Sequence, residues 1–377
     1  MSANFPTPLR ELKGLTGLRF LAALYVFVFH LDMPHRTPLA YLPARLGNVI
    51  QQGRLGVCVF FVLSGFVLTY SHLKDFPTPH FRGKRYYLGF LYKRLARIYP
   101  VFLVGLLICL FISQAQGTLP SWKLVGLSAT FLQTYIPRVS MQWYDMAAWS
   151  VANEFFFYLL FPLLLPLLLR VRRRGALLAL LGGLALLSTA LGVAQGAGLL
   201  RYELVFPFPP SRLAEFVAGI VGALLVFRFG WRVRPGVAVA LLALTAVYLA
   251  FAGPLVSGRL THNWLVVPTV VALLAVLAQP RQSRAFAWLE SRPMQYLGRI
   301  SYSFYIAQLP LVFVLDPLLA SGRLSHTDWR VAPLALLINL LGGVLLHELV
   351  EKKAHAVLMR RYKRYVAARA KRLAMAS

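Results

Sequence analysis

The chain has 377 residues, of which 58% are hydrophobic and only 14% charged, and its mean hydropathy is +0.64. This composition is typical of a protein with many membrane-spanning segments and excludes an ordinary soluble enzyme. A formal net charge of +28 would indicate a nucleic-acid partner in a soluble protein. Here most of the basic residues lie in short loops between apolar runs, where they set orientation, so we expect a lipid bilayer and no nucleic acid as partner.

Ten apolar runs are long enough to cross a bilayer as helices. They lie near residues 15–33, 55–72, 98–114, 149–169, 175–193, 211–227, 236–253, 263–279, 300–319 and 332–350. We therefore expect an all-α polytopic membrane protein with about ten transmembrane helices. The run Trp122–Tyr135 is too short to span comfortably and is interpreted as a re-entrant or interfacial segment. No cleavable signal peptide is apparent, so we expect the first span to remain as an anchor.

The distribution of basic residues predicts the orientation of these spans. With both termini in the cytoplasm, 30 of the 40 Lys and Arg residues fall on the cytoplasmic side, as the positive-inside rule requires. We expect residues 1–350 to form one membrane-embedded domain. Residues 351–377 then form a basic cytoplasmic tail, which we expect to lie on the anionic inner leaflet.

The first predicted span carries two polar side chains, Arg19 near its start and His30 near its end. Eleven residues at about 100° each return a helix to within roughly 20° of the same face, about 16 Å further along its axis. A cation at the bilayer centre costs at least about 2.5 kcal/mol on insertion scales, so both side chains should face the protein interior or a wet cavity. Singly, each has a structural interpretation, as a snorkelling arginine and a packing histidine. As a pair on one face, they favour function.

Two more basic residues stand at the start of the third predicted span. Arg94 and Arg97 are three residues apart and share a helix face where the chain enters the membrane. One interpretation is anchoring at the positively charged inner side. The other is a phosphate clamp, because guanidinium forks match the geometry of phosphates. Spacing alone leaves both open.

The fourth predicted span contains a lone carboxylate, Glu154, among aromatic residues about a turn inside the outer surface. An intramembrane carboxylate is costly unless it is paired, so a functional role is the default interpretation. Arg212 and Glu215, three residues apart at the sixth span, are instead predicted to form a structural ion pair.

Two further motifs suggest chemistry but lack the pattern that it needs. Ser64-Gly65 in the second span has no G-x-S-x-G and no strand before it, so close helix packing is the better interpretation. His347-Glu348 lacks the second histidine of H-E-x-x-H because position 351 is Glu. The two cysteines, Cys58 and Cys109, have no metal-ligand or disulfide spacing. We therefore expect no metal.

Together these motifs resemble the acyltransferase 3 family of bacterial integral membrane acyltransferases. The similarity covers nearly the whole chain and rests on Arg19 and His30 as R-x10-H, Gly56–Phe66, Arg94–Pro100, Trp149–Tyr158, Arg212–Phe216 and Gly298–Tyr305. Two positions differ from the family's usual pattern. Cys58 stands where the family often has Asp, and Gln308 stands where a histidine is common.

The resemblance implies transfer of an acyl group, commonly acetyl, from cytoplasmic acyl-CoA to a hydroxyl of an outward-facing carbohydrate. His30 and Glu154 would be the catalytic residues. Imidazole titrates near neutral pH, so His30 suits the removal of a proton from the attacking hydroxyl. Glu154 would fix the tautomer of His30 or hold the sugar. Direct transfer and an acyl-histidine intermediate both remain open.

The same resemblance assigns the substrate-binding residues and the location. Acyl-CoA, as acetyl-CoA, would bind to Arg19, Arg94 and Arg97 on the inner side. The residues that would contact the acceptor or support the catalytic side chains are Trp149, Ser150, Tyr158 and Tyr302. The expected location is the bacterial inner membrane, and the expected acceptor is an exopolysaccharide, a lipopolysaccharide or a glycolipid.

Alternative functions follow from the same sequence. The acceptor could be the sugar of a secondary metabolite. A transporter could use the buried Arg, His and Glu as a substrate path, but we find no convincing internal repeat of the kind common in transporters. A structural subunit of a polysaccharide export complex would leave the shared face of Arg19 and His30 unexplained. The sequence does not decide whether the protein forms a homo-oligomer.

Overall fold

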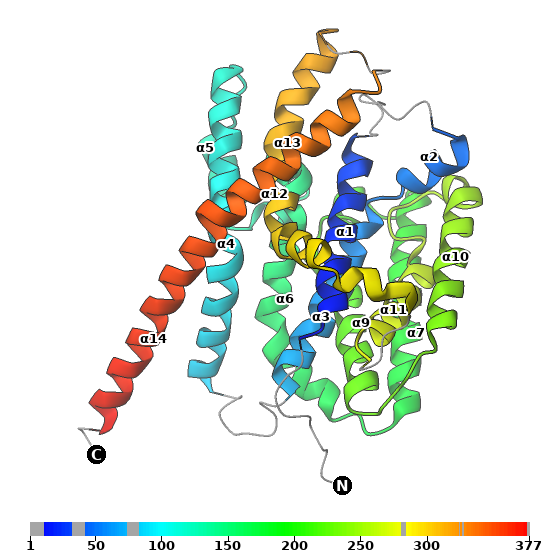
Figure 1. Ribbon diagram of the computed structural model, residues 1–377, viewed down its shortest axis with the longest axis vertical. Coiled ribbons are helices and arrows are strands. Elements are labelled where there is room, and N and C mark those ends of the chain that lie inside the picture. The colour runs from blue at the N-terminus through cyan, green and yellow to red at the C-terminus, as the bar shows by residue number, and fades with distance from the viewer. Residues whose placement is uncertain are drawn as a thin grey trace.

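We analysed the fold in a computed structural model, which describes residues 11–31, 42–73, 83–279, 284–323, 325 and 328–374. Every regular element in this part of the chain is a helix (Figure 1). The predicted all-α membrane fold is therefore confirmed.

The described helices coincide with all ten predicted apolar runs. The long helices are α1 (Lys13–Leu31), α3 (Leu55–His72), α4 (Lys84–Ala115), α6 (Asp145–Leu169), α7 (Arg174–Gly196), α9 (Pro209–Phe227), α10 (Pro235–Phe251), α11 (Asn263–Leu277), α12 (Arg292–Ala320) and α13 (Val331–Leu346). In the described ranges, eight helical stretches are long and apolar enough to cross a membrane. The other two apolar helices, α10 and α11, have 17 and 15 residues. The count of ten spans stays a prediction.

Shorter helices lie between the long ones. They are α2 (Ala44–Ile50), α5 (Trp122–Ala129) and α8 (Tyr202–Val205), with 3₁₀ turns at Gln133–Tyr135, Gly253–Leu255 and Arg284–Glu290. With eight residues, α5 is far too short to span, in agreement with the interpretation of Trp122–Tyr135 as non-spanning.

The two ends of the bundle can be named from its first antiparallel pair. At the lower end in Figure 1, α3 ends at His72 and α4 begins at Lys84. At the upper end, α1 ends at Leu31 and α3 begins at Leu55. The last helix also finishes at the lower end.

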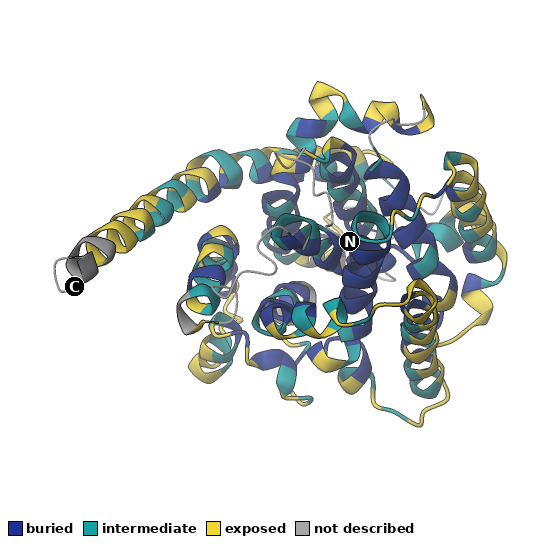
Figure 2. Cartoon of the chain, turned by 90° about the horizontal axis from the view of Figure 1, so that it is seen from below, coloured by how far each residue is buried: buried dark blue, intermediate teal, exposed yellow. Residues whose placement is uncertain are grey.

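The core lies around α9 and α11, nearly all of whose side chains are buried. Large apolar side chains on α7, α10 and α13 are exposed instead, and Figure 2 shows the buried residues at the centre and the exposed ones at the rim. An apolar outer surface of this kind suits contact with lipid.

Glycines allow the central helices to approach one another closely. A Cβ atom at Gly65 would lie 2.1 Å from the Phe216 carbonyl oxygen, and one at Gly219 would lie 1.9 Å from that of Val62. These contacts support the interpretation of Ser64-Gly65 as a packing motif, as far as Gly65 is concerned. A Cβ at Gly298 of α12 would lie 2.1 Å from the Thr16 carbonyl oxygen, which fixes α12 against the first turns of α1.

Three helices begin at least four residues earlier than the apolar runs indicated. α4 begins at Lys84 rather than near 98, α12 at Arg292 rather than near 300, and α6 at Asp145 rather than near 149. Lys and Arg are good helix formers, so a helix can continue through basic residues at which an apolar run stops. As a result Arg94 and Arg97 lie inside a helix, and Glu154 lies nine residues after the start of α6, about 14 Å along its axis. The expectation that Glu154 lies about a turn inside the outer surface stays a prediction.

The C-terminal segment continues the last predicted span. α13 passes through a π-helical turn at His347–Glu351 into α14 (Lys352–Ala374). α14 packs on the first half of α4, where Tyr92 and Tyr362 stack with ring centroids 5.1 Å apart. Its far half extends away from the bundle (Figure 2). The assignment of residues 351–377 to a cytoplasmic tail on the inner leaflet stays a prediction.

The distribution of basic residues predicts which end faces the cytoplasm. Cysteines introduced at Arg173 and Lys363, at the lower end, should be shielded from an impermeant thiol reagent in intact cells. Cysteines at Lys123 and Ser321, at the upper end, should react. The native Cys58 and Cys109 are buried and should give little background labelling. Labelling at Arg173 and Lys363 but not at Lys123 and Ser321 would show that the orientation is the opposite of the predicted one.

Candidate active site

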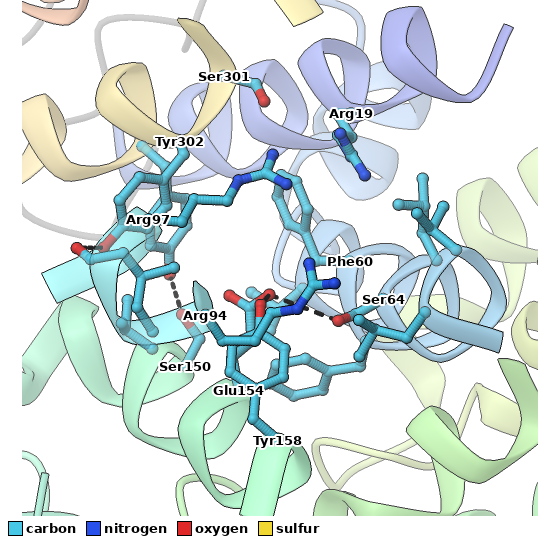
Figure 3. A pocket seen from close by; sticks show the side chains of 18 residues that line it. Arg19, Phe60, Ser64, Arg94, Arg97, Ser150, Glu154, Tyr158, Ser301 and Tyr302 are labelled. Carbon is cyan, nitrogen blue, oxygen red and sulfur yellow. Dashed lines mark hydrogen bonds between the residues drawn. The ribbon is translucent and has the colours of Figure 1, made fainter. Parts of the chain in front are cut away.

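A cavity of about 110 Å³ lies inside the bundle between α1, α3, α4, α6 and α12. Its polar lining residues are Arg19, Ser64, Arg94, Arg97, Ser150, Glu154, Tyr158, Ser301, Tyr302 and Tyr305 (Figure 3). Small-molecule sites usually have volumes of about 300–1,000 Å³. The cavity therefore has room for a reacting group of a substrate and not for a whole nucleotide-bearing molecule.

Three arginines meet at this cavity from two helices. Arg19 comes from α1, and Arg94 and Arg97 come from α4, so the shared face predicted for Arg94 and Arg97 points into the bundle (Figure 3). Arg19 and Arg94 are half-buried, and Arg97 is exposed. Among the described residues, none of the three forms an ion pair with a carboxylate.

Among the described residues, the side chains of these arginines have no hydrogen-bond partner either. The Nε atom of Arg94 is buried without a partner among the described residues, and its guanidinium lies 5.4 Å from the ring centroid of Phe90. A buried guanidinium N–H without an acceptor is costly unless a ligand accepts the hydrogen bond. The cavity therefore has the character of an anion-binding site.

Glu154 is the carboxylate of this cavity. It accepts hydrogen bonds from Tyr158 Oη and from Ser64 Oγ, the latter at 3.4 Å. Its charge acts on Arg19 and Arg94, although neither is within ion-pair distance. One carboxylate against three guanidinium groups leaves the site with an excess of positive charge.

Hydrogen bonds from α12 connect the walls of the cavity. Tyr305 Oη and Ser150 Oγ are 2.8 Å apart and join α12 to α6. Tyr302 Oη donates to the Ile98 carbonyl at 2.7 Å and joins α12 to α4, one residue after Arg97. These contacts hold the predicted residues Ser150 and Tyr302 in fixed positions at the cavity.

Trp149 lies behind the cavity rather than in its lining. Its ring is buried, packs on Phe61 with centroids 6.2 Å apart, and lies 5.2 Å from the Arg212 guanidinium. Arg212 and Glu215 form the predicted ion pair, fully buried, with two bonds of 2.8 and 2.9 Å. Cys58 lies beside this pair. Trp149 is thus part of a structural layer that supports the cavity wall.

His30 lies apart from the described lining of the cavity, eleven residues beyond Arg19 on α1. Its Nδ1 is 3.0 Å from Oε1 of Gln308, the residue that replaces the family's common histidine. The Gln308 amide nitrogen donates to the Ala23 carbonyl at 3.4 Å, which directs Oε1 toward His30. Because Oε1 can only accept, Nδ1 carries the proton and Nε2 is the basic nitrogen.

The structure thus brings seven of the nine predicted site residues to one cavity and leaves His30 and Trp149 outside it. Sequence reasoning missed Ser64, Ser301 and Tyr305. Ser64 was assigned to helix packing, but only its neighbour Gly65 faces α9, because consecutive helical residues point about 100° apart. The spacing of Ser64 from Phe60 and Phe61, on the same face of α3, was the available signal.

Among the described residues, no group of three His, Cys, Asp or Glu side chains could hold a metal ion. The arrangement offers guanidinium groups for an anion and hydroxyl and carboxylate groups for a polar substrate. The fold and the site define a multi-pass membrane protein with a cationic cavity between its helices.

Comparison with known proteins identifies the family. A family model described as an acyltransferase domain, Acyl_transf_3, matches residues 12–348. The acyltransferase MdmB of Streptomyces mycarofaciens is 31% identical over 380 residues, which cover 94% of this chain and 95% of that protein. The O-acetyltransferase OatA of Staphylococcus aureus is 22% identical over 336 residues, 84% of this chain. No solved structure matches.

The chain therefore belongs to the acyltransferase 3 family and is an acyltransferase. It matches MdmB over nearly the full length of both proteins but spans only about half the length of OatA, with 53% of that protein covered.

The unpartnered arginines predict the effect of their removal. Replacing both Arg94 and Arg97 by Ala should raise the Kd of acetyl-CoA by roughly tenfold or more, because a hydrogen bond to a charged group contributes about 1.5–3 kcal/mol. Lys at both positions should restore binding only in part, since it lacks the guanidinium fork. Binding to the purified protein in neutral-lipid nanodiscs measures this.

The matched control is Arg172→Ala, which removes an exposed charge from the lower end and should leave the affinity unchanged. Unchanged acetyl-CoA affinity in a folded double Ala variant would show that Arg94 and Arg97 do not bind the donor and serve only to anchor the helix at the membrane surface.

Proposed function

We propose that this protein is an O-acyltransferase of the bacterial cytoplasmic membrane, and that it transfers an acetyl group from acetyl-CoA to a hydroxyl of a carbohydrate. The observation that carries the proposal is the cluster of three arginines at one cavity without a carboxylate partner among the described residues. The phosphates of acyl-CoA supply the anions that such a cluster requires. The printed name of OatA, an O-acetyltransferase, supports acetyl as the group and oxygen as the acceptor atom.

In this proposal the donor enters from the lower end, which faces the cytoplasm. Its phosphates bind to Arg19, Arg94 and Arg97, and its long flexible arm carries the thioester toward the upper half of α1. His30 lies about 16 Å beyond Arg19 along that helix.

His30 acts as the general base. The acceptor hydroxyl gives its proton to Nε2 of His30 while its oxygen attacks the thioester carbonyl. The tetrahedral intermediate then collapses, the carbon–sulfur bond breaks, and the CoA thiolate leaves and takes up the proton from His30. Gln308 holds the His30 ring in the tautomer that this step needs.

Because Gln308 fixes the tautomer of His30, Glu154 is not needed for that role. Glu154 hydrogen-bonds to Tyr158 and Ser64 within the cavity, so we assign it the second role considered for it, holding the sugar. Ser150, Tyr158 and Tyr302 present their hydroxyl groups to the same space. Trp149 supports Phe61, which lines the cavity.

The acceptor that we propose is an outward-facing carbohydrate of an exopolysaccharide, a lipopolysaccharide or a glycolipid. A sugar of a secondary metabolite is the second candidate. We keep residues 1–350 as the acyltransferase domain and residues 351–377 as a basic tail on the inner leaflet.

The general-base role of His30 can be tested directly. Removing a general base typically costs about 10²–10⁴ in rate. His30→Gln keeps a hydrogen-bonding side chain but loses the basic nitrogen, so it should lose transfer from labelled acetyl-CoA while its affinity for acetyl-CoA stays near that of the wild type. Gln308→Asn, which shortens the side chain that orients His30, should lower the rate less.

Two results would contradict the proposal. Wild-type transfer by His30→Gln across pH 6–8 would make His30 a packing residue. Wild-type protein that neither binds acetyl-CoA nor releases CoA from it would refute the assigned donor.

A further inference from the structure

A second group of cationic and aromatic side chains lies in the upper half of the bundle. Arg54 directly precedes α3, Tyr202 begins α8, and Arg259 and His262 lie in the connection between α10 and α11. These residues are far apart in the sequence and come from three parts of the chain. The activity proposed above uses none of them.

The two arginines of this group have no carboxylate partner among the described residues. The groups that act on the charge of Arg54 are Arg259, Tyr202 and Tyr25, and the Nε atom of Arg54 is buried without a hydrogen-bond acceptor. Its only side-chain hydrogen bond in the described structure runs from Nη1 to the Gln51 carbonyl at 3.2 Å. Burial and then the Arg259 charge lower the pKa of Arg54 to about 10, so it stays protonated at neutral pH.

Arg259 is held in place by neutral groups. Its guanidinium lies 5.3 Å from the ring centroid of Tyr202 and 5.6 Å from that of Phe206. Its backbone N–H donates to Gln195 Oε1 at 3.0 Å. Stacking on aromatic rings orients a guanidinium without using its hydrogen-bond donors, which stay available for a ligand.

His262 adds a buried polar atom to the group. Its side chain has no exposed surface, its Nδ1 is 3.1 Å from Tyr248 Oη, and its Nε2 has no partner in the described structure. Burial and then the Arg54 charge lower the pKa of His262 to about 4, so the imidazole is neutral at pH 7. A buried imidazole nitrogen left without a hydrogen bond is a further sign that a ligand is missing.

Arg54 and Arg259 are half-buried, and two such cations without a counter-charge among the described residues are unfavourable in a protein that has nothing to bind there. Arg201, next to Tyr202 in the sequence, shows the ordinary alternative. It is exposed, and its Nε lies 3.5 Å from Glu203. We propose that Arg54 and Arg259, together with Tyr202 and His262, form a second binding site that holds an anionic group, a phosphate or a carboxylate, on the acceptor.

The position of this site suits an acceptor that meets the donor inside the bundle. Arg54 lies ten residues before Ser64 of the cavity, about 15 Å along α3. The turn that contains Arg54 packs on the upper half of α1, because a Cβ at Gly53 would lie 2.4 Å from the Tyr25 carbonyl oxygen. Tyr25 Oη also donates to the Val49 carbonyl of α2 at 2.6 Å. That half of α1 also carries His30. An anion held here would place its neighbouring hydroxyls on the His30 side of the donor cavity.

A layer of aromatic contacts connects the two sites. Phe206 lies under Arg259 and packs on Trp149 with ring centroids 4.5 Å apart. Trp149 in turn packs on Phe61 of the cavity lining. This inference rests on the proposed function, because it takes the bound anion to be part of the acyl acceptor.

The test uses the purified full-length protein in phosphatidylcholine nanodiscs, with glucose 1-phosphate as the anionic probe and glucose as its uncharged counterpart. The double variant Arg54→Gln, Arg259→Gln should raise the Kd of glucose 1-phosphate at least tenfold. It should leave the weak binding of glucose and the binding of acetyl-CoA unchanged. Arg201→Gln is the matched control and should behave like the wild type.

Equal affinity of the double variant and the wild type for glucose 1-phosphate would overturn the inference, and so would an equal loss in Arg201→Gln. If the double variant fails to bind acetyl-CoA through misfolding, the single variant Arg259→Gln, in a connecting segment, replaces it and should still lose at least threefold. The variant Arg54→Lys, Arg259→Lys should keep most of the affinity, because the charge remains.

A lipid headgroup is the other source of the same anionic chemistry. Adding phosphatidylglycerol to the nanodiscs distinguishes the two sources. If the site binds the acceptor and not a lipid headgroup, the affinity of wild-type protein for glucose 1-phosphate should not change when phosphatidylglycerol is added. A fall in that affinity that the double variant does not share would overturn the assignment to the acceptor. Failure of wild-type protein to bind acetyl-CoA would refute the proposed function. The glucose 1-phosphate affinities of wild type and double variant could still be compared, so the two failures are distinguishable.

Discussion

Positive charge placed inside an apolar bundle needs a counter-charge, and this requirement separates the arginines of this protein into two kinds. Arg212 meets it within the chain, through a bidentate bond to Glu215 and contact with aromatic rings. Arg19, Arg94 and Arg97 do not meet it with any described carboxylate. Each arginine at the centre of a bilayer costs about 2.5–3.5 kcal/mol on insertion scales, so three that stay unpaired are explained best by an anionic substrate.

The helices around the cavity are held together by contacts that tolerate little change. Gly65 and Gly219 bring α3 and α9 into backbone contact, and Gly298 does the same for α12 and α1. Hydrogen bonds from Tyr302 and Tyr305 then join α12 to α4 and α6. Within this frame none of the three guanidinium groups forms an ion pair with Glu154. The charges are therefore available at the moment of binding and need no rearrangement.

The sequence predicts helix type and identity well, because apolar runs of spanning length and polar residues at helical spacing are local signals. Arg212 and Glu215 were predicted as an ion pair on spacing alone, and the structure confirms it. The sequence placed the start of α6 too late because a helix can start before its apolar run does. The contact between His30 and Gln308 joins residues 278 apart in the sequence, and no local pattern reports such a pair. Tertiary packing decides these features, and only the structure shows them.

The most direct test of the account is a cryo-EM structure of the protein in neutral-lipid nanodiscs with a non-reactive thioether analogue of acetyl-CoA. The account predicts density for the phosphates within hydrogen-bond distance of Arg19, Arg94 and Arg97, and the thioether directed along α1 toward His30. A map that shows the analogue bound elsewhere, with the three guanidinium groups still unpartnered, would contradict it.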